Sequence, residues 1–129
     1  MNKQISVEVF FEILEELSNP DLQVKLWLNI ENEGGLISSF TELLNDVDGP
    51  DFNYVASNLI EDSDLKKELF ILLEKIKNYK EPTSYKKYKN DVFIISDPNW
   101  KTIRDYTKEI KRKYDLSFQR LKEKYLTTG

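Results

Sequence analysis

The segment from Leu26 to Phe52, LWLNIENEGGLISSFTELLNDVDGPDF, contains a helix end, a chain reversal and a new helix start in close succession. Its two adjacent glycines, Gly34 and Gly35, tolerate positive φ and therefore predict a sharp reversal. Ser39 and Glu42 have the S-x-x-E spacing of a capping box, which predicts that a helix begins at Ser39. Two helices joined by a tight reversal are typical of an all-α fold.

Outside this segment, apolar residues recur at spacings of three and four, which predicts further amphipathic helices. The predicted helices cover residues 6–18, 20–30, 39–48, 50–60, 64–79 and 98–124. We expect Ser6 to cap the first of these helices, and Asp97 followed by Pro98 to begin the last. The second helix is apolar over more than one face, so we expect it to be central, with Trp27 as a core anchor.

No repeat, low-complexity tract or interdomain linker interrupts the chain. We therefore predict one compact all-α domain over residues 1–129, with six to seven helices and no substantial sheet. Residues 80–91 are interpreted as a loop, residues 92–95 as buried extended chain or a helical turn. The last helix is predicted to be continuous, although the sequence at 115–117 also permits a break into two helices.

Charge is divided unequally along the chain. Residues 1–65 contain two lysines against fourteen acidic residues, a net charge of −12, whereas residues 66–129 contain seventeen basic residues against nine acidic ones, a net charge of +8. Such asymmetry is typical of a protein with a charged partner, and it also allows the two halves to attract one another within one domain.

Composition argues against several kinds of chemistry. The sequence has no cysteine and no histidine, so it lacks thiol nucleophiles, disulfides, and the commonest general base and metal ligand. The glycine pair is not followed by the Gly-Lys-Ser/Thr of a phosphate-binding loop, and the spacing of Asp46, Asp48 and Asp51 does not fit a calcium loop. Adjacent Glu15 and Glu16 point about 100° apart on a helix, and we interpret them as a solvated face. We expect no enzymatic activity, no cofactor and no metal.

No secretory signal and no membrane-spanning apolar run is recognisable in the sequence, so we expect a cytoplasmic protein without a membrane partner.

An ordered set of structural motifs resembles a family of small helical bacterial proteins, over about residues 20–115. The motifs are Leu26-Trp27-Leu28, Gly34-Gly35, Ser38-Ser39-Phe40, Glu42 with the aspartates after it, the Leu65–Leu73 helix and Asp97-Pro98-Asn99-Trp100. Some members of that family resemble immunity proteins encoded beside polymorphic or contact-dependent growth inhibition toxins. The resemblance implies a bacterial protein that binds and neutralises a cognate toxin.

The leading hypothesis is therefore an immunity protein with an acidic surface that occludes a basic toxin, with a nuclease domain as the expected kind of toxin. The residues predicted to contact the toxin are Glu31, Glu33, Glu42, Asp46, Asp48, Asp51, Glu61, Asp62 and Asp64. The alternative for these acids is a solvated set of turns and helix caps. The alternative function is a nucleic-acid-binding or adaptor module that uses the basic C-terminal half, including the lysines and tyrosines of residues 80–91.

Overall fold

The computed structural model describes residues 2–30 and 37–126, and within these ranges the chain forms nine α-helices, one π-helix and no strand. The elements are α1 (Lys3–Ser18), α2 (Pro20–Trp27), α3 (Phe40–Val47), α4 (Pro50–Tyr54), the π-helix η1 (Val55–Leu59), α5 (Ser63–Lys77), α6 (Thr83–Tyr88), α7 (Val92–Ile95), α8 (Pro98–Lys113) and α9 (Asp115–Leu126). The predicted all-α class is confirmed, with more helices than the six to seven expected. No helix of the described residues is long and apolar enough to cross a membrane.

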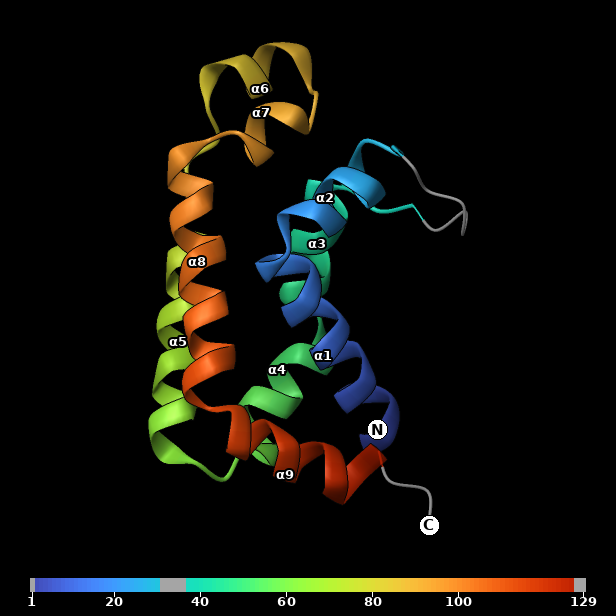
Figure 1. The fold of residues 1–129 in the computed structure, drawn as a ribbon, viewed down its shortest axis with the longest axis vertical. Coiled ribbons are helices and arrows are strands. Elements are labelled where there is room, and N and C mark those ends of the chain that lie inside the picture. The colour runs from blue at the N-terminus through green and yellow to red at the C-terminus, as the bar shows by residue number, and fades with distance from the viewer. Residues whose placement is uncertain (1, 31–36, 127–129) are drawn as a thin grey trace.

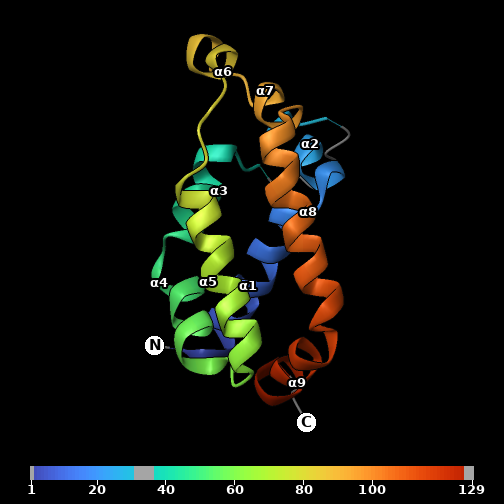
Figure 2. The ribbon, with the colours of Figure 1, turned by 90° about the vertical axis from the view of Figure 1, so that its left-hand side faces the viewer.

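Helix α1 occupies the centre of the fold. It contacts α2, α3, α4, η1, α8 and α9, whereas α2 contacts chiefly α1 and α7. The expectation that the second helix would be central was therefore wrong. Helices α5 and α8 lie side by side, α9 crosses the lower end, and α6 and α7 lie at the upper end (Figure 1 and Figure 2).

Side-chain caps mark the starts of α1, α2, α3, α5 and α8. Ser39 accepts a hydrogen bond from the Glu42 backbone N–H at 3.0 Å, and Asp97 caps α8, as predicted. The predicted cap at Ser6 is wrong, because α1 begins earlier, at Lys3, with Asn2 accepting from the Ile5 N–H at 3.1 Å. An asparagine side chain satisfies a free helix N–H as well as a serine does.

The C-terminal half is more broken than predicted. Residues interpreted as a loop include the short helix α6, and residues 92–95 form the helical alternative, α7. The predicted long helix is divided at Tyr114, whose backbone (φ −109°, ψ 27°) is not helical. The break turns α9 away from α8, across the end of α1 (Figure 1).

Two aromatic clusters fill the core. The upper cluster joins α2, α3, α6 and α8 through the rings of Trp27, Phe40, Tyr85 and Trp100, and Trp27 is only 8% exposed, as predicted for a core anchor. The lower cluster joins α1, α4 and α9 through three phenylalanines, Phe10, Phe52 and Phe118. Because these rings come from distant parts of the sequence, they fix α1 between α3–α4 and α8–α9.

The buried amide of Gln23, on α2, connects the C-terminal end of α1 to α8. Gln23 is fully buried, and its Nε2 donates to the carbonyl oxygens of Glu16 (2.8 Å) and Leu17 (3.1 Å) at the end of α1. Its Oε1 accepts from Trp100 Nε1 at 3.2 Å and from Arg104 Nη1 at 3.4 Å. The amide thus satisfies carbonyl groups that a helix end leaves free, and it positions α2 against α8.

Candidate functional site

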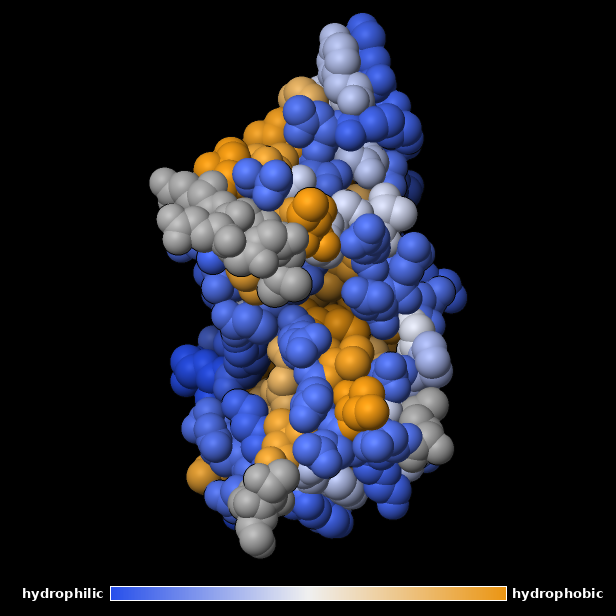
Figure 3. Space-filling model, turned by 90° about the vertical axis from the view of Figure 1, so that its right-hand side faces the viewer, coloured by the Kyte–Doolittle hydropathy of each residue, from blue (hydrophilic) through white to orange (hydrophobic). Residues whose placement is uncertain are grey.

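An open groove of about 770 Å³ lies over the C-terminal half of α1, between α2, α3 and the start of α9. We call it the α1–α3 groove. Its apolar lining residues are Phe11, Leu14, Leu22, Leu26, Ile37 and Phe118. Its charged lining residues are Glu12, Glu15, Glu16, Glu42, Asp46, Asp115, Lys111 and Lys122. Figure 3 shows this side of the molecule, where apolar surface runs between hydrophilic side chains.

Glu16 holds one side of the groove together. Its Oε2 accepts hydrogen bonds from Trp27 Nε1 at 3.0 Å and from Ser38 Oγ at 2.9 Å. Burial raises the pKa of the Glu16 carboxyl despite these two hydrogen bonds, and the nearby negative charges of Asp46 and Glu42 raise it further. Through these two hydrogen bonds, Glu16 holds the last residue of α2, Trp27, and Ser38, which precedes α3, against α1.

The interpretation of Glu15 and Glu16 as a solvated face is therefore wrong for Glu16. A buried tryptophan needs an acceptor for its indole N–H, and that requirement draws one of the two carboxylates inward. Glu15 is exposed, as predicted.

Two lysines lie on the α8–α9 side of the groove, and one of them forms an ion pair there. Lys111 Nζ lies 2.6 Å from Glu15 Oε2 and 3.0 Å from Ser18 Oγ, and the hydrogen bond to Glu15 lowers the pKa of the Glu15 carboxyl. Lys122 Nζ lies 4.7 Å from the centre of the Phe11 ring. Both lysines thus have partners on α1: Lys111 pairs with Glu15, and Lys122 lies over the Phe11 ring.

The α3 side of the groove carries carboxylates that are not neutralised in this way. Glu12 and Glu16 are one turn apart on α1, and Glu42 and Asp46 are one turn apart on α3. None of the four takes part in an ion pair within residues 2–30 and 37–126. This part of the groove is therefore strongly negative.

Of the seven predicted contact acids that the structure describes, two, Glu42 and Asp46, line the groove. Glu31 and Glu33, like the predicted reversal at Gly34 and Gly35, lie outside the described residues. Asp48 and Asp51 lie beyond the groove, at and after the end of α3. Asp48 is exposed, whereas Asp51 accepts a hydrogen bond from the buried Ser6 hydroxyl at 2.7 Å.

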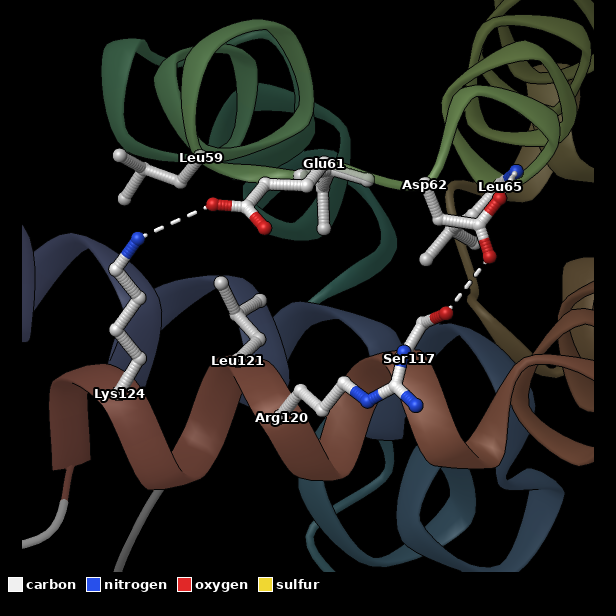
Figure 4. A pocket seen from close by; sticks show the side chains of 9 residues that line it. Leu59, Glu61, Asp62, Leu65, Ser117, Arg120, Leu121 and Lys124 are labelled. Carbon is white, nitrogen blue, oxygen red and sulfur yellow. Dashed lines mark hydrogen bonds and ion pairs between the residues drawn. The ribbon is translucent and has the colours of Figure 1, made fainter.

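The last three predicted acids, Glu61, Asp62 and Asp64, lie at the start of α5, where a cavity of about 310 Å³ separates this turn from α9. Lys124 Nζ donates to Glu61 at 3.1 Å, and Ser117 Oγ donates to Asp62 at 2.7 Å (Figure 4). The Ser117 hydrogen bond, together with the backbone N–H groups that Asp62 caps, lowers the pKa of the Asp62 carboxyl. Glu61 and Asp62 thus link α5 to α9, so the seven predicted acids that the structure describes do not form one continuous surface.

Sequence reasoning did not include Glu12, Glu15 and Glu16 among the candidate residues. One signal for them was available: Glu12 and Glu16 are spaced by four on a predicted helix, so they share a face. The position of Glu16 near Glu42 and Asp46 is a tertiary contact, which helical spacing alone does not reveal.

The groove has the chemistry of a binding surface. The carboxylates that line it are spread over α1, α3 and α9, and no group of three or more acidic side chains in the described ranges is arranged to hold a metal ion. Spread carboxylates over an apolar lining suit several cationic side chains of a larger partner.

Comparison with known proteins adds no relative: no protein-family model matches the chain, and searches of curated proteins and of solved structures found no significant match.

Proposed function

We propose that this protein is a cytoplasmic bacterial immunity protein that binds a cognate antibacterial toxin and neutralises it without catalysing a reaction. The observation that carries the proposal is the α1–α3 groove, in which an apolar lining is bordered on the α3 side by carboxylates that have no ion-pair partner among the described residues. The sequence motifs support the same function, because they resemble a family of small helical bacterial proteins, some of whose members resemble immunity proteins.

The proposed mechanism is occlusion. A toxin that cleaves RNA or DNA needs a basic surface to bind phosphate groups. A groove lined by carboxylates attracts such a surface, accelerates the encounter and competes with nucleic acid for the same cations. Binding alone is sufficient for protection, so the groove needs neither nucleophile nor cofactor.

The test uses the protein encoded by the gene adjacent to the gene for this protein, which the proposal expects to be the toxin. The two purified proteins should co-elute in size-exclusion chromatography, and one equivalent of this protein should abolish the toxin's nuclease activity. The variant Glu42→Lys/Asp46→Lys should lose inhibition by about tenfold or more, because it reverses two charges in the groove.

A matched control is Glu74→Lys/Glu123→Lys, which makes the same charge change at two exposed glutamates outside the groove. It should inhibit like the unmodified protein. Failure of the unmodified protein to bind the toxin, or equal loss in both double variants, would contradict the proposal.

A second candidate function is binding of single-stranded nucleic acid at the α6–α7 end. Tyr88 is 62% exposed there, and the Lys87 ammonium lies 5.2 Å from the centre of its ring. Exposed aromatic rings flanked by lysines stack on bases and contact phosphates. A gel shift with single-stranded RNA at low salt would show this binding, and Tyr88→Ala should abolish it.

A further inference from the structure

The most exposed apolar part of the α1–α3 groove lies next to α2. Ile37 is 68% exposed, and the half-buried Leu22 and Leu26 line the groove with it. An isolated exposed isoleucine is ordinary, but three aliphatic side chains lining one groove mark a place where another apolar surface fits.

The position of Asp46 is unfavourable for the isolated protein. Asp46 lies in the last turn of α3, where the helix dipole disfavours negative charge. It is also one turn from Glu42 and near enough to Glu16 for its negative charge to act there. A residue that opposes the local electrostatics without a compensating contact is expected at a functional site.

The chain between α2 and α3 contains no basic residue that could neutralise the carboxylates of the groove. The segment 31–36, which connects α2 to Ile37, contains two glutamates and no lysine or arginine. The two lysines that line the groove are engaged with Glu15 and Phe11 on the opposite side. A partner with cationic side chains would therefore complement the charge of the α3 side, which is otherwise balanced only by solvent and dissolved ions.

We propose that the α1–α3 groove binds a cationic amphipathic helix of the partner protein. Aliphatic side chains of that helix pack against Leu22, Leu26 and Ile37, and its lysines or arginines lie over the paired carboxylates of α1 and α3. Cationic residues three or four apart on a helix match carboxylates spaced by one helical turn. A helix that lays its apolar face in a groove between other helices is an established mode of recognition.

This inference rests on the proposed function only for the identity of the partner as a toxin. The occupant's chemistry, a helix with one apolar and one cationic face, follows from the groove itself.

The protein contains its own reporter for occupancy. Trp27 Nε1 donates to Glu16 within the groove, whereas Trp100 Nε1 donates to Gln23 in the core and Trp100 is fully buried. The two indole N–H groups give separate NMR signals. Binding in the groove changes the surroundings of the first directly, and it reaches the second only through the packing of the two rings, whose centres lie 6.1 Å apart.

The experiment titrates the ¹⁵N-labelled protein at low salt with a synthetic helical peptide of about 18 residues, a length that supports helix formation. Leucines form one face of the peptide, and lysines spaced by four form the other. A second peptide has the same composition in an order that destroys both faces. We expect the Trp27 indole signal to shift in a saturable way and by more than the Trp100 signal, and the reordered peptide to bind about tenfold or more weakly.

Variants locate the site. Glu42→Lys/Asp46→Lys should raise the dissociation constant about tenfold or more, whereas Glu74→Lys/Glu123→Lys should leave it unchanged. All four side chains are exposed, so the fold should tolerate the substitutions. Equal binding of both peptides would show attraction by charge alone, and an unmoved Trp27 signal would show binding elsewhere; either result overturns the inference.

Two further outcomes separate the alternatives. If the Trp27 signal shifts with protein concentration in the absence of peptide, and sedimentation shows association, the groove binds a second copy of this chain and the inference is wrong. If the amphipathic peptide binds as expected but the adjacent toxin does not, the helix-binding groove stands and the immunity function fails.

Discussion

The α3 side of the groove and the α5–α9 contact are both rich in acids, yet their acids have opposite roles. At the α5–α9 contact, Asp62 caps a helix and accepts from Ser117, and Glu61 pairs with Lys124. At the α3 side of the groove, Glu42 and Asp46 have no ion-pair partner among the described residues. An acidic run in the sequence therefore indicates a binding surface only where the fold leaves its charge uncompensated.

The largest change in stability should follow substitution of Glu16. This acid lines the groove, like Glu42 and Asp46, but it also has a structural role, like Asp62, because it accepts hydrogen bonds from Trp27 and Ser38. Glu16→Ala leaves the buried Trp27 indole N–H and the Ser38 hydroxyl without their acceptor, which should lower the free energy of unfolding by about 1–3 kcal/mol. Urea denaturation measures this change. Glu12→Ala, one turn away and exposed, should change it by less than about 0.5 kcal/mol. Equal effects would show that Glu16 has no special structural role.

A smaller loss should follow Asp62→Ala at the neutralised contact. The substitution removes the N-cap of α5 and the acceptor of the Ser117 hydroxyl, and should cost about 1 kcal/mol in the free energy of unfolding. Ser117→Ala keeps the cap and should cost less. Partner binding should be unaffected by either variant, and a loss of affinity would place this contact in the binding surface after all.

Unlike the two substitutions above, Asp46→Asn in the groove should raise the free energy of unfolding. Replacing this carboxylate removes an unfavourable interaction with the end of the α3 dipole and should stabilise the protein by about 0.3–1 kcal/mol. The gain should shrink in high salt, which screens exposed charges. Thermal unfolding at low and high salt measures both, with the exposed Glu123→Gln as control; a loss of stability would mean that Asp46 has a favourable contact in the free protein.

The smallest effect concerns pH. The pKa of Glu16 is raised in the folded protein, chiefly by burial, so the folded state holds its proton more tightly than the unfolded state does. This contribution to stability is full below the unfolded pKa of about 4.5 and is lost as the pH rises through the higher folded pKa.

The substitution Glu16→Gln keeps an acceptor oxygen for the same two hydrogen bonds and removes the titrating group. The difference in melting temperature, Glu16→Gln minus unmodified protein, should therefore be more positive at about pH 7 than at about pH 4. A difference that does not change with pH would show that the folded pKa of Glu16 is not raised.

Much of the fold could be predicted from local signals. Apolar residues spaced by three and four predict a helix from its own sequence. The Ser39 cap and the Asp97-Pro98 start likewise act within a few residues of the helix they begin, and both were confirmed. The second helix was expected to be central because it is apolar over more than one face, but centrality depends on which helices surround it. That is a tertiary property, and α1 holds the place instead.

The candidate site was less predictable for the same reason. Helical spacing places Glu42 and Asp46 on one face of α3, but it does not show that this face borders α1. Nor does it show that Glu61 and Asp62 meet Lys124 and Ser117, which are more than fifty residues away in sequence. Which acids are free for a partner is decided by these long-range contacts.

Gln23 has a consequence for the order in which the chain can fold during synthesis. The donors that satisfy its buried oxygen, Trp100 and Arg104, are 77 and 81 residues further along the chain. Until they leave the ribosome, this oxygen must stay hydrated and α2 has no α8 to pack against. The acidic first half, with its net charge of −12, therefore emerges before the basic second half that completes its core. A chain that terminates prematurely before Trp100 should be recognised as unfolded by cellular proteases, however well its first helices form.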